Sequence, residues 1–191
     1  MRVLIDLDGV IADLVGAWHL WHEANCPLRR NGHACRDIRQ STEYRIENYV
    51  ECGESIQNFF DINPYAFVKP VEGAIEGLRQ LVELCPDYWV ISTIPKRYPH
   101  QYIYKLNYVA SLKVVDARRF IAVRDSKDGV WGTILIDDNP DNLETWSGPY
   151  RVLFDAPWNR QVKSQFIRAR GWPAIIKVIL QYISQEETYG R

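Results

Sequence analysis

Short apolar runs rich in branched side chains alternate along most of the chain with segments whose apolar residues have helical spacing. The runs predict strands at residues 2–6, 88–91, 120–123, 133–136 and 150–154. The helical spacing predicts helices at residues 12–23, 70–85, 99–112 and 172–184. Alternation of this kind is typical of an α/β protein whose mostly parallel sheet is covered by helices on both faces.

One stretch of the chain departs from the alternation. Residues 14–69 show helices and turns without a strand, including one or two helices at residues 43–60 that break near Gly53. We interpret residues 14–69 as a small helical cap inserted after the first strand. Residues 1–13 and 70–191 then form a Rossmann-like, three-layer core.

Composition limits the classes of function. The 191 residues are 47% hydrophobic and carry a net charge of −1, so we expect a well-packed core and no nucleic-acid polymer as partner. No apolar stretch approaches the roughly 18 residues of a membrane span, and Asp6 and Asp8 interrupt the first apolar run, so neither membrane attachment nor a signal peptide is expected. The four cysteines form no CxxC pair, which favours a reducing, cytoplasmic location.

Acidic residues end two of the predicted strands. Asp6 and Asp8 are two residues apart on one face of a strand, and Gly9 allows a sharp turn directly after them. Asp137 and Asp138 follow another apolar strand and offer the hard oxygen ligands that Mg²⁺ prefers. The alternatives are solvated turn acids for the first pair and a helix N-terminus for the second.

Two further segments carry groups suited to phosphate. Ser92 and Thr93 follow the strand at residues 88–91, and their hydroxyl groups can hold phosphate oxygens or cap an ordinary turn. Lys127 lies ten residues before Asp137 and can offset repulsion between carboxylates and a phosphoryl group, or be a solvated surface lysine. Because all four segments follow strands of one predicted sheet, we expect them to form a single site.

The order of these segments resembles the four signatures of the haloacid dehalogenase superfamily of phosphotransferases. The longer matches resemble its 5'(3')-deoxyribonucleotidase branch and cover about residues 1–15 and 68–180. They are Asp6-Leu-Asp-Gly-Val-Ile-Ala-Asp13, Lys69-Pro-Val-Glu-Gly-Ala-Ile-Glu-Gly-Leu78, Val123-Arg-Asp-Ser-Lys127, Ile134-Leu-Ile-Asp-Asp138, and Val152-Leu-Phe-Asp155 with Trp158-Asn-Arg160.

The resemblance implies hydrolysis of a phosphomonoester through an aspartyl-phosphate intermediate. Asp6 would be the nucleophile, and Asp8 would protonate the leaving alkoxide and then deprotonate the attacking water. Ser92 would hold the transferring phosphoryl group, and Lys127 would bind both Asp6 and the phosphate. We expect the pKa of Asp8 to be raised by its anionic neighbours.

The resemblance also implies the cofactor and the partners. Mg²⁺ would be bound by Asp138, the Asp6 carboxylate and the Asp8 carbonyl, with Asp137 in support. Thr93 and Lys105 fall where this branch places further phosphate contacts. The expected substrate is a nucleoside monophosphate, a deoxynucleotide before a ribonucleotide, and a homodimer is a further expectation. A phosphatase of sugar or other small phosphates and a non-catalytic nucleotide-binding protein are the alternatives.

The predicted cap leaves two questions open. Its aromatic residues can stack on a nucleotide base or pack the cap against the core. These are Trp18, Trp21, Tyr44, Tyr49, Phe59, Phe60, Tyr65 and Phe67. Its histidines and cysteines match no standard zinc-finger spacing, although they offer zinc ligands. These are His19, His22, Cys26, His33 and Cys35.

Overall fold

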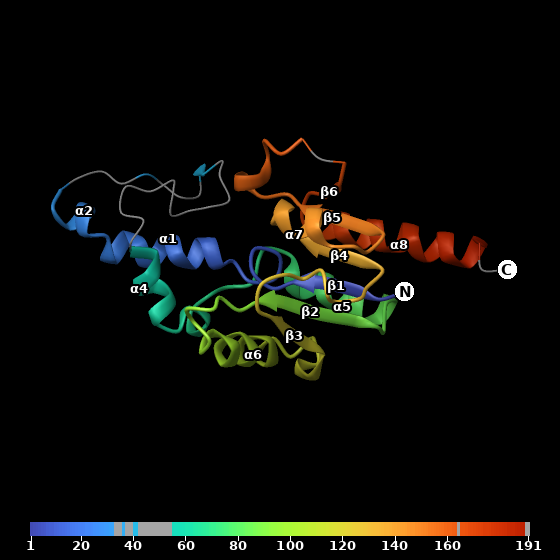
Figure 1. The fold of residues 1–191 in the computed structure, drawn as a ribbon, viewed down its shortest axis with the longest axis horizontal. Coiled ribbons are helices and arrows are strands. Elements are labelled where there is room, and N and C mark those ends of the chain that lie inside the picture. The colour runs from blue at the N-terminus through green and yellow to red at the C-terminus, as the bar shows by residue number, and fades with distance from the viewer. Residues whose placement is uncertain (33–35, 37–39, 42–54, 164, 190–191) are drawn as a thin grey trace.

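The computed structural model describes residues 1–32, 36, 40–41, 55–163 and 165–189 (Figure 1). Its centre is a six-stranded parallel sheet with the strand order β3-β2-β1-β4-β5-β6. The strands are β1 (Val3–Asp6), β2 (Tyr88–Thr93), β3 (Phe120–Val123), β4 (Ile134–Asp137), β5 (Tyr150–Phe154) and β6 (Ile167–Ala169). The predicted α/β class is confirmed, and the sheet has a sixth strand, β6, that the sequence pattern does not predict.

Helices account for most of the remaining described chain. The α-helices are α1 (Leu14–Asn25), α2 (Pro27–Arg30), α4 (Ser55–Asp61), α5 (Ala74–Leu84), α6 (Gln101–Ser111), α7 (Pro140–Thr145) and α8 (Trp172–Tyr189). The 3-10 helices are η2 (Pro64–Ala66), η3 (Ala117–Arg119) and η4 (Pro157–Asn159). Helix α5 begins at residue 74 rather than 70, because Gly73 at its N-terminus has a left-handed backbone with φ of 75°. Residues 42–54, which carry most of the helices predicted at residues 43–60, lie outside the described part of the chain.

The core lies on both faces of the sheet because alternate strand residues point in opposite directions. On β1, Val3 and Ile5 belong to one apolar cluster, which includes buried residues of α5, α6 and α8. Leu4 belongs to a second cluster on the opposite face, with Leu143 of α7 and the following residue Trp146. This is the predicted three-layer arrangement.

The carboxyl ends of the strands form one edge of the sheet. In the register, Asp6 pairs with Ile91 of β2, and Ile5 pairs with Ile136 of β4. Parallel pairing therefore places Asp6 level with Ile91, directly before Ser92, and one residue beyond the Ile5–Ile136 pair, as Asp137 is. Helices α1 and α4 lie beyond this edge, on the opposite side of the molecule from the two termini (Figure 1). Among the described helices, none combines the length and the apolar character needed to cross a bilayer.

Candidate active site at the carboxyl edge of the sheet

A buried lysine joins the acids at the ends of β1 and β4. The Nζ atom of Lys127 lies 2.6 Å from Oδ1 of Asp6 and 2.6 Å from Oδ2 of Asp137. Only 1% of Lys127 is exposed. Burial opposes its charge, but the charges of Asp137 and Asp6 and their hydrogen bonds outweigh this effect and raise the pKa of Lys127. Lys127 is therefore a fixed cation within hydrogen-bond distance of Asp6.

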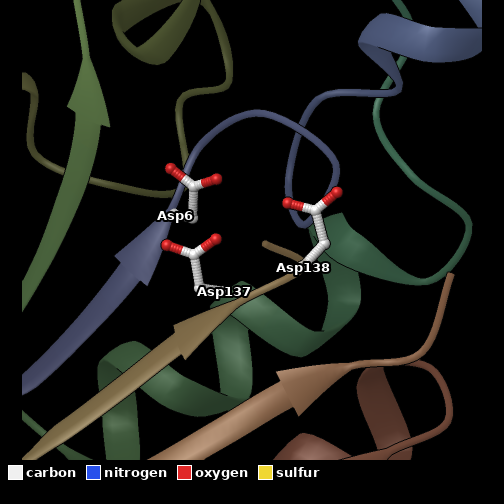
Figure 2. Close-up of side chains that lie close together, drawn as sticks. All are labelled: Asp6, Asp137 and Asp138. Atoms are coloured by element: carbon white, nitrogen blue, oxygen red, sulfur yellow. The ribbon is translucent and has the colours of Figure 1, made fainter. Parts of the chain in front are cut away.

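Three carboxylates gather around this lysine. Ligand atoms of Asp6, Asp137 and Asp138 all lie within 4.8 Å of one another, and the three residues are buried. Figure 2 shows the three side chains side by side where β1 and β4 end. Burial and the charges of Asp137 and Asp8 raise the pKa of Asp6 to about 8, although Lys127 acts in the opposite direction. Burial and the charges of Asp137 and Asp6 likewise raise the pKa of Asp138 well above its ordinary value.

The cluster has the composition of a divalent-cation site. One lysine does not balance three buried carboxylates, so without a further cation the cluster holds protons instead of carrying its full negative charge. Oδ1 of Asp138 is buried and has no hydrogen-bond partner among the described residues. Carboxylate oxygens are the ligands that Mg²⁺ selects. The residues present thus fit Mg²⁺, which Asp6 and Asp138 would bind, while Asp137 would contribute through its contact with Lys127.

These pKa shifts predict how stability changes with pH in the absence of divalent cations. The folded protein holds a proton on Asp6 up to about pH 8, whereas an unfolded aspartate loses it near pH 4. The free energy of unfolding is therefore expected to fall between about pH 4 and pH 8, by at most about 1.4 kcal/mol per pH unit for each such proton. Urea unfolding in EDTA at pH 5 and pH 8 measures this change.

Magnesium should remove most of this pH dependence, because a bound cation replaces the proton in balancing the carboxylates. We expect Mg²⁺ to stabilise the protein more at pH 8 than at pH 5. Equal stability at the two pH values in EDTA would contradict the raised pKa values of these buried carboxyl groups.

The contacts of Asp138 fix its orientation. Nε1 of Trp158 donates to its Oδ2 at 2.8 Å, and Nδ2 of Asn159 donates to its backbone carbonyl at 2.8 Å. Asn159 also donates to the carbonyl of Phe154 and accepts from Arg168 at 2.8 Å. The sequence offers Trp158 and Asn159 only as part of a longer match to the resembled branch, and their support of Asp138 is visible only in the structure.

The backbone of Gly9 packs directly against the side chain of Asp138. Its φ is 81°, and a Cβ atom placed on it would lie 2.3 Å from Oδ2 of Asp138. Gly9→Ala is therefore expected to displace Asp138, to weaken Mg²⁺ binding about 10-fold, and to cost about 1–2 kcal/mol in backbone strain. Thermal unfolding followed across a Mg²⁺ titration measures both effects.

Gly129→Ala is the matched control for this substitution. A Cβ atom on Gly129 would meet nothing within 4 Å, so Mg²⁺ binding and stability should remain close to those of the unmodified protein. If Gly9→Ala binds Mg²⁺ as tightly as Gly129→Ala, the close approach of Gly9 to Asp138 has no role in the site.

The carboxylate of Asp8 has its own set of three donors, none of which is Lys127. Tyr65 donates its hydroxyl to Oδ1, while Ser92 at 3.1 Å and Lys105 at 2.6 Å donate to Oδ2. Nζ of Lys105 also donates to Oγ of Ser92 and to the carbonyl of Thr93, each at 2.8 Å. Burial alone would raise the pKa of Asp8, but the charge of Lys105 and the three hydrogen-bonding side chains lower it overall. The sequence-based prediction of a raised pKa is wrong for the free protein, because the charge of Lys105, 2.6 Å away, and the three hydrogen bonds outweigh burial.

The structure therefore brings the predicted residues together as two lysine–carboxylate groups. Thr93 takes part through its backbone carbonyl. Asp137 and Asp138 also precede a helix N-terminus, as the alternative interpretation of this segment predicts. The side chain of Asn139 caps α7 directly after them. One loop thus ends the acidic strand and begins a helix.

The predicted zinc alternative gains no support in the part of the chain that can be described. His19, His22 and Cys26 are buried in and just after α1, while His33 and Cys35 lie outside the described residues. The described residues contain one group of three potential metal ligands, and it is the aspartate cluster. Of the cap aromatics, Trp18 and Phe59 are buried in the main core, and Tyr44 and Tyr49 lie outside the described residues.

Comparison with known proteins identifies the family. The model of the family described as 5' nucleotidase, deoxy (pyrimidine), cytosolic type C matches residues 1–185. The chain belongs to this family. It is 33% identical over 178 residues to a 5'(3')-deoxyribonucleotidase of Clostridium acetobutylicum, covering 88% of each chain. It is 26% identical over 180 residues to the 5'(3')-deoxyribonucleotidase of Bacillus subtilis, covering 93% of this chain and 98% of the relative.

Solved structures share the fold. A haloacid dehalogenase family hydrolase from Deinococcus radiodurans, with bound phosphate and sodium, aligns with a TM-score of 0.58 at 15% identity, covering 95% of each chain. A predicted phosphatase from Clostridium acetobutylicum aligns with a TM-score of 0.57 at 14% identity, covering 94% of this chain and 98% of the other. The type C 5'-nucleotidase family and the haloacid dehalogenase fold are those that the sequence signatures indicate.

Proposed function

We propose that the protein is a Mg²⁺-dependent phosphomonoester hydrolase that acts on nucleoside monophosphates, deoxynucleotides before ribonucleotides, through an aspartyl-phosphate on Asp6. The observation that carries the proposal is the placement of Asp6. Its Oδ1 atom accepts from Lys127, and its ligand oxygen lies within 4.8 Å of those of Asp137 and Asp138. This arrangement supplies an anionic nucleophile together with the means to neutralise a phosphate dianion.

Charge is the main barrier to this reaction. A phosphomonoester dianion repels a carboxylate, so attack requires compensation at the reacting atoms. Lys127 provides one positive charge within hydrogen-bond distance of Asp6. When bound by Asp6, Asp138 and the Asp8 carbonyl, Mg²⁺ would supply the remaining positive charge and polarise the phosphoryl oxygens. Ionised Asp6 is then a competent nucleophile, and its acyl-phosphate is readily hydrolysed.

The two steps assign a different task to each aspartate. The carboxylate of Asp6 attacks phosphorus, the bond from phosphorus to the ester oxygen breaks, and the leaving oxygen takes a proton from Asp8. Water then attacks the phosphorus of the acyl-phosphate while Asp8 takes its proton, and the bond from phosphorus to the Asp6 oxygen breaks. Inorganic phosphate leaves, and both aspartates return to their starting states.

The low pKa of Asp8 in the free protein is consistent with this role. Lys105 and Ser92, which hold Asp8 ionised, are also the donors that the sequence assigns to phosphate. A bound phosphate dianion competes for these donors and adds negative charge nearby, and both effects raise the pKa of Asp8. Substrate binding would thereby promote the protonation that the first step needs.

The proposal that the substrates are nucleotides is supported by the family and by relatives named 5'(3')-deoxyribonucleotidase.

We also interpret residues 14–69 as a cap over a core of residues 1–13 and 70–191. The position of α1 and α4 beyond the carboxyl edge of the sheet supports this interpretation (Figure 1). The homodimer stays a prediction.

A phosphate-release screen tests the function. Deoxy- and ribonucleoside 5'- and 3'-monophosphates are compared with sugar phosphates, each in Mg²⁺ and in EDTA. We expect the highest kcat/KM for a deoxynucleoside monophosphate and loss of activity in EDTA. A preference for sugar phosphates would favour the sugar phosphatase alternative, and nucleotide binding without phosphate release would favour the non-catalytic one.

A further inference from the structure

Tyr65 approaches the catalytic edge from outside the core. It lies in η2, in the segment that leads from α4 back to the sheet, and it is buried with 6% of its surface exposed. Its hydroxyl donates to Oδ1 of Asp8. The other two donors to Asp8 are Ser92 of β2 and Lys105 of α6, which both belong to the predicted core. Among the described residues of the inserted segment, Tyr65 is therefore the one that reaches the Asp8 carboxylate.

We propose that Tyr65 is a positioning residue, whose hydroxyl fixes the plane of the Asp8 carboxylate so that Asp8 can deliver its proton to the leaving oxygen. This inference rests on the proposed phosphomonoester hydrolysis. It gives the tyrosine a role other than the base stacking or simple packing that the sequence suggests for the cap aromatics.

The distribution of donors over the two oxygens supports this role. Ser92 and Lys105 both bind Oδ2, so on their own they would anchor Asp8 at one atom. The terminal torsion of an aspartate is broad, and a carboxylate held at one oxygen can turn about its last bond. A donor on Oδ1 removes this freedom, and Tyr65 is the donor that the described residues provide there. Proton transfer depends steeply on such alignment.

Tyr65 is itself held rigidly. Backbone hydrogen bonds from Ala66 to Asn63 and from Val68 to Pro64 close the turn around it. Its ring lies 5.7 Å from that of Tyr108, and the ammonium group of Lys105 lies 5.8 Å from its centre. A rigid donor can impose its geometry on Asp8, whereas an exposed and mobile tyrosine could not.

Substrates with different leaving groups separate positioning of Asp8 from a merely structural role. An alkyl phosphate, such as the nucleoside monophosphate that the enzyme hydrolyses best, needs a proton on its leaving oxygen, whereas p-nitrophenyl phosphate releases a stable phenolate without one. For Tyr65→Phe we expect kcat/KM for the nucleotide to fall about 10-fold, because Asp8 loses a hydrogen bond that aligns it with the leaving oxygen. For p-nitrophenyl phosphate we expect kcat/KM to stay within about 2-fold of the unmodified protein, because its leaving group needs no proton from Asp8. Competitive inhibition by inorganic phosphate should stay within about 2-fold, because ground-state binding is unaffected.

Tyr108→Phe is the matched control. Its ring packs on Tyr65, and its buried hydroxyl has no hydrogen-bond partner in the described part of the chain. Both substrates should keep their kcat/KM within about 2-fold in this variant. The ratio of kcat/KM for the nucleotide to kcat/KM for p-nitrophenyl phosphate does not depend on how much of a preparation is folded. It therefore separates a change at the site from a loss of folded protein.

The outcomes are distinguishable. An equal loss for both substrates in Tyr65→Phe would make Tyr65 a structural residue and overturn the inference, as would no loss for either. If the unmodified protein hydrolyses neither substrate in Mg²⁺, the proposed function fails, and this inference fails with it.

Discussion

Asp6→Asn is expected to lower kcat by at least about 10⁴-fold, because it removes the nucleophile while preserving the shape of the side chain. The Nζ atom of Lys127 would lose one of the two carboxylates within 2.6 Å but would keep Asp137. The variant should therefore fold and still bind inorganic phosphate. Phosphate release under saturating substrate measures the loss.

Trapping the acyl-phosphate by acid quenching shows whether Asp6 is the nucleophile or only binds the cation. With substrate labelled at phosphorus, the unmodified protein should yield a labelled acyl-phosphate, and Asp6→Asn should yield none. Asp6→Glu keeps the charge but moves the attacking oxygen, so it should also be inactive. Asp141→Asn, at an exposed position in the first turn of α7, is the control and should retain activity. Two results would exclude Asp6 as the nucleophile: a labelled acyl-phosphate in Asp6→Asn, or a kcat of Asp6→Asn close to that of Asp141→Asn.

Lys127→Met is expected to have the largest effect on stability. It removes a cation that contacts both Asp6 and Asp137 at a position that is 1% exposed. Buried carboxylates without their partner should lower the free energy of unfolding by about 3–5 kcal/mol in EDTA at pH 8. Urea unfolding measures this change, and activity should be lost as well, since Asp6 and the phosphate would no longer share a cation.

Mg²⁺ should restore part of the stability of Lys127→Met, because a cation bound by the same carboxylates offsets their repulsion. Lys177→Met, on an exposed face of α8, is the control and should change the free energy of unfolding by no more than about 0.5 kcal/mol. If Lys127→Met in EDTA is no less stable than this control, Lys127 does not balance the aspartates.

The sequence predicts the sheet and the main residues of the site because both depend on regular geometry. Apolar runs mark β1 and β4 as buried strands, and parallel strands bring their carboxyl ends to one edge. That rule places Asp6 beside Asp137 without knowledge of any contact. The strand β6 is missed because three residues, with Ile167 partly exposed, are too few to show a period.

The surroundings of Asp8 are not predictable in the same way. Its three donors lie 57, 84 and 97 residues further along the chain, in a 3-10 helix, a strand and a helix. The strand pattern places Ser92 at the site, and the family resemblance adds Lys105, but neither shows that both side chains bind the same oxygen of Asp8. The predicted direction of the Asp8 pKa shift is wrong for this reason.

The sequence by itself determined the α/β class, five of the six strands and the acidic residues at the ends of β1 and β4, since these follow from side-chain periodicity along each strand. Only the tertiary structure decided which cation faces which carboxylate, that Trp158 and Gly9 confine Asp138, and that Tyr65 reaches Asp8 from the inserted segment. Electrostatic and hydrogen-bond energies change over a few ångströms, and packing between distant segments sets those distances.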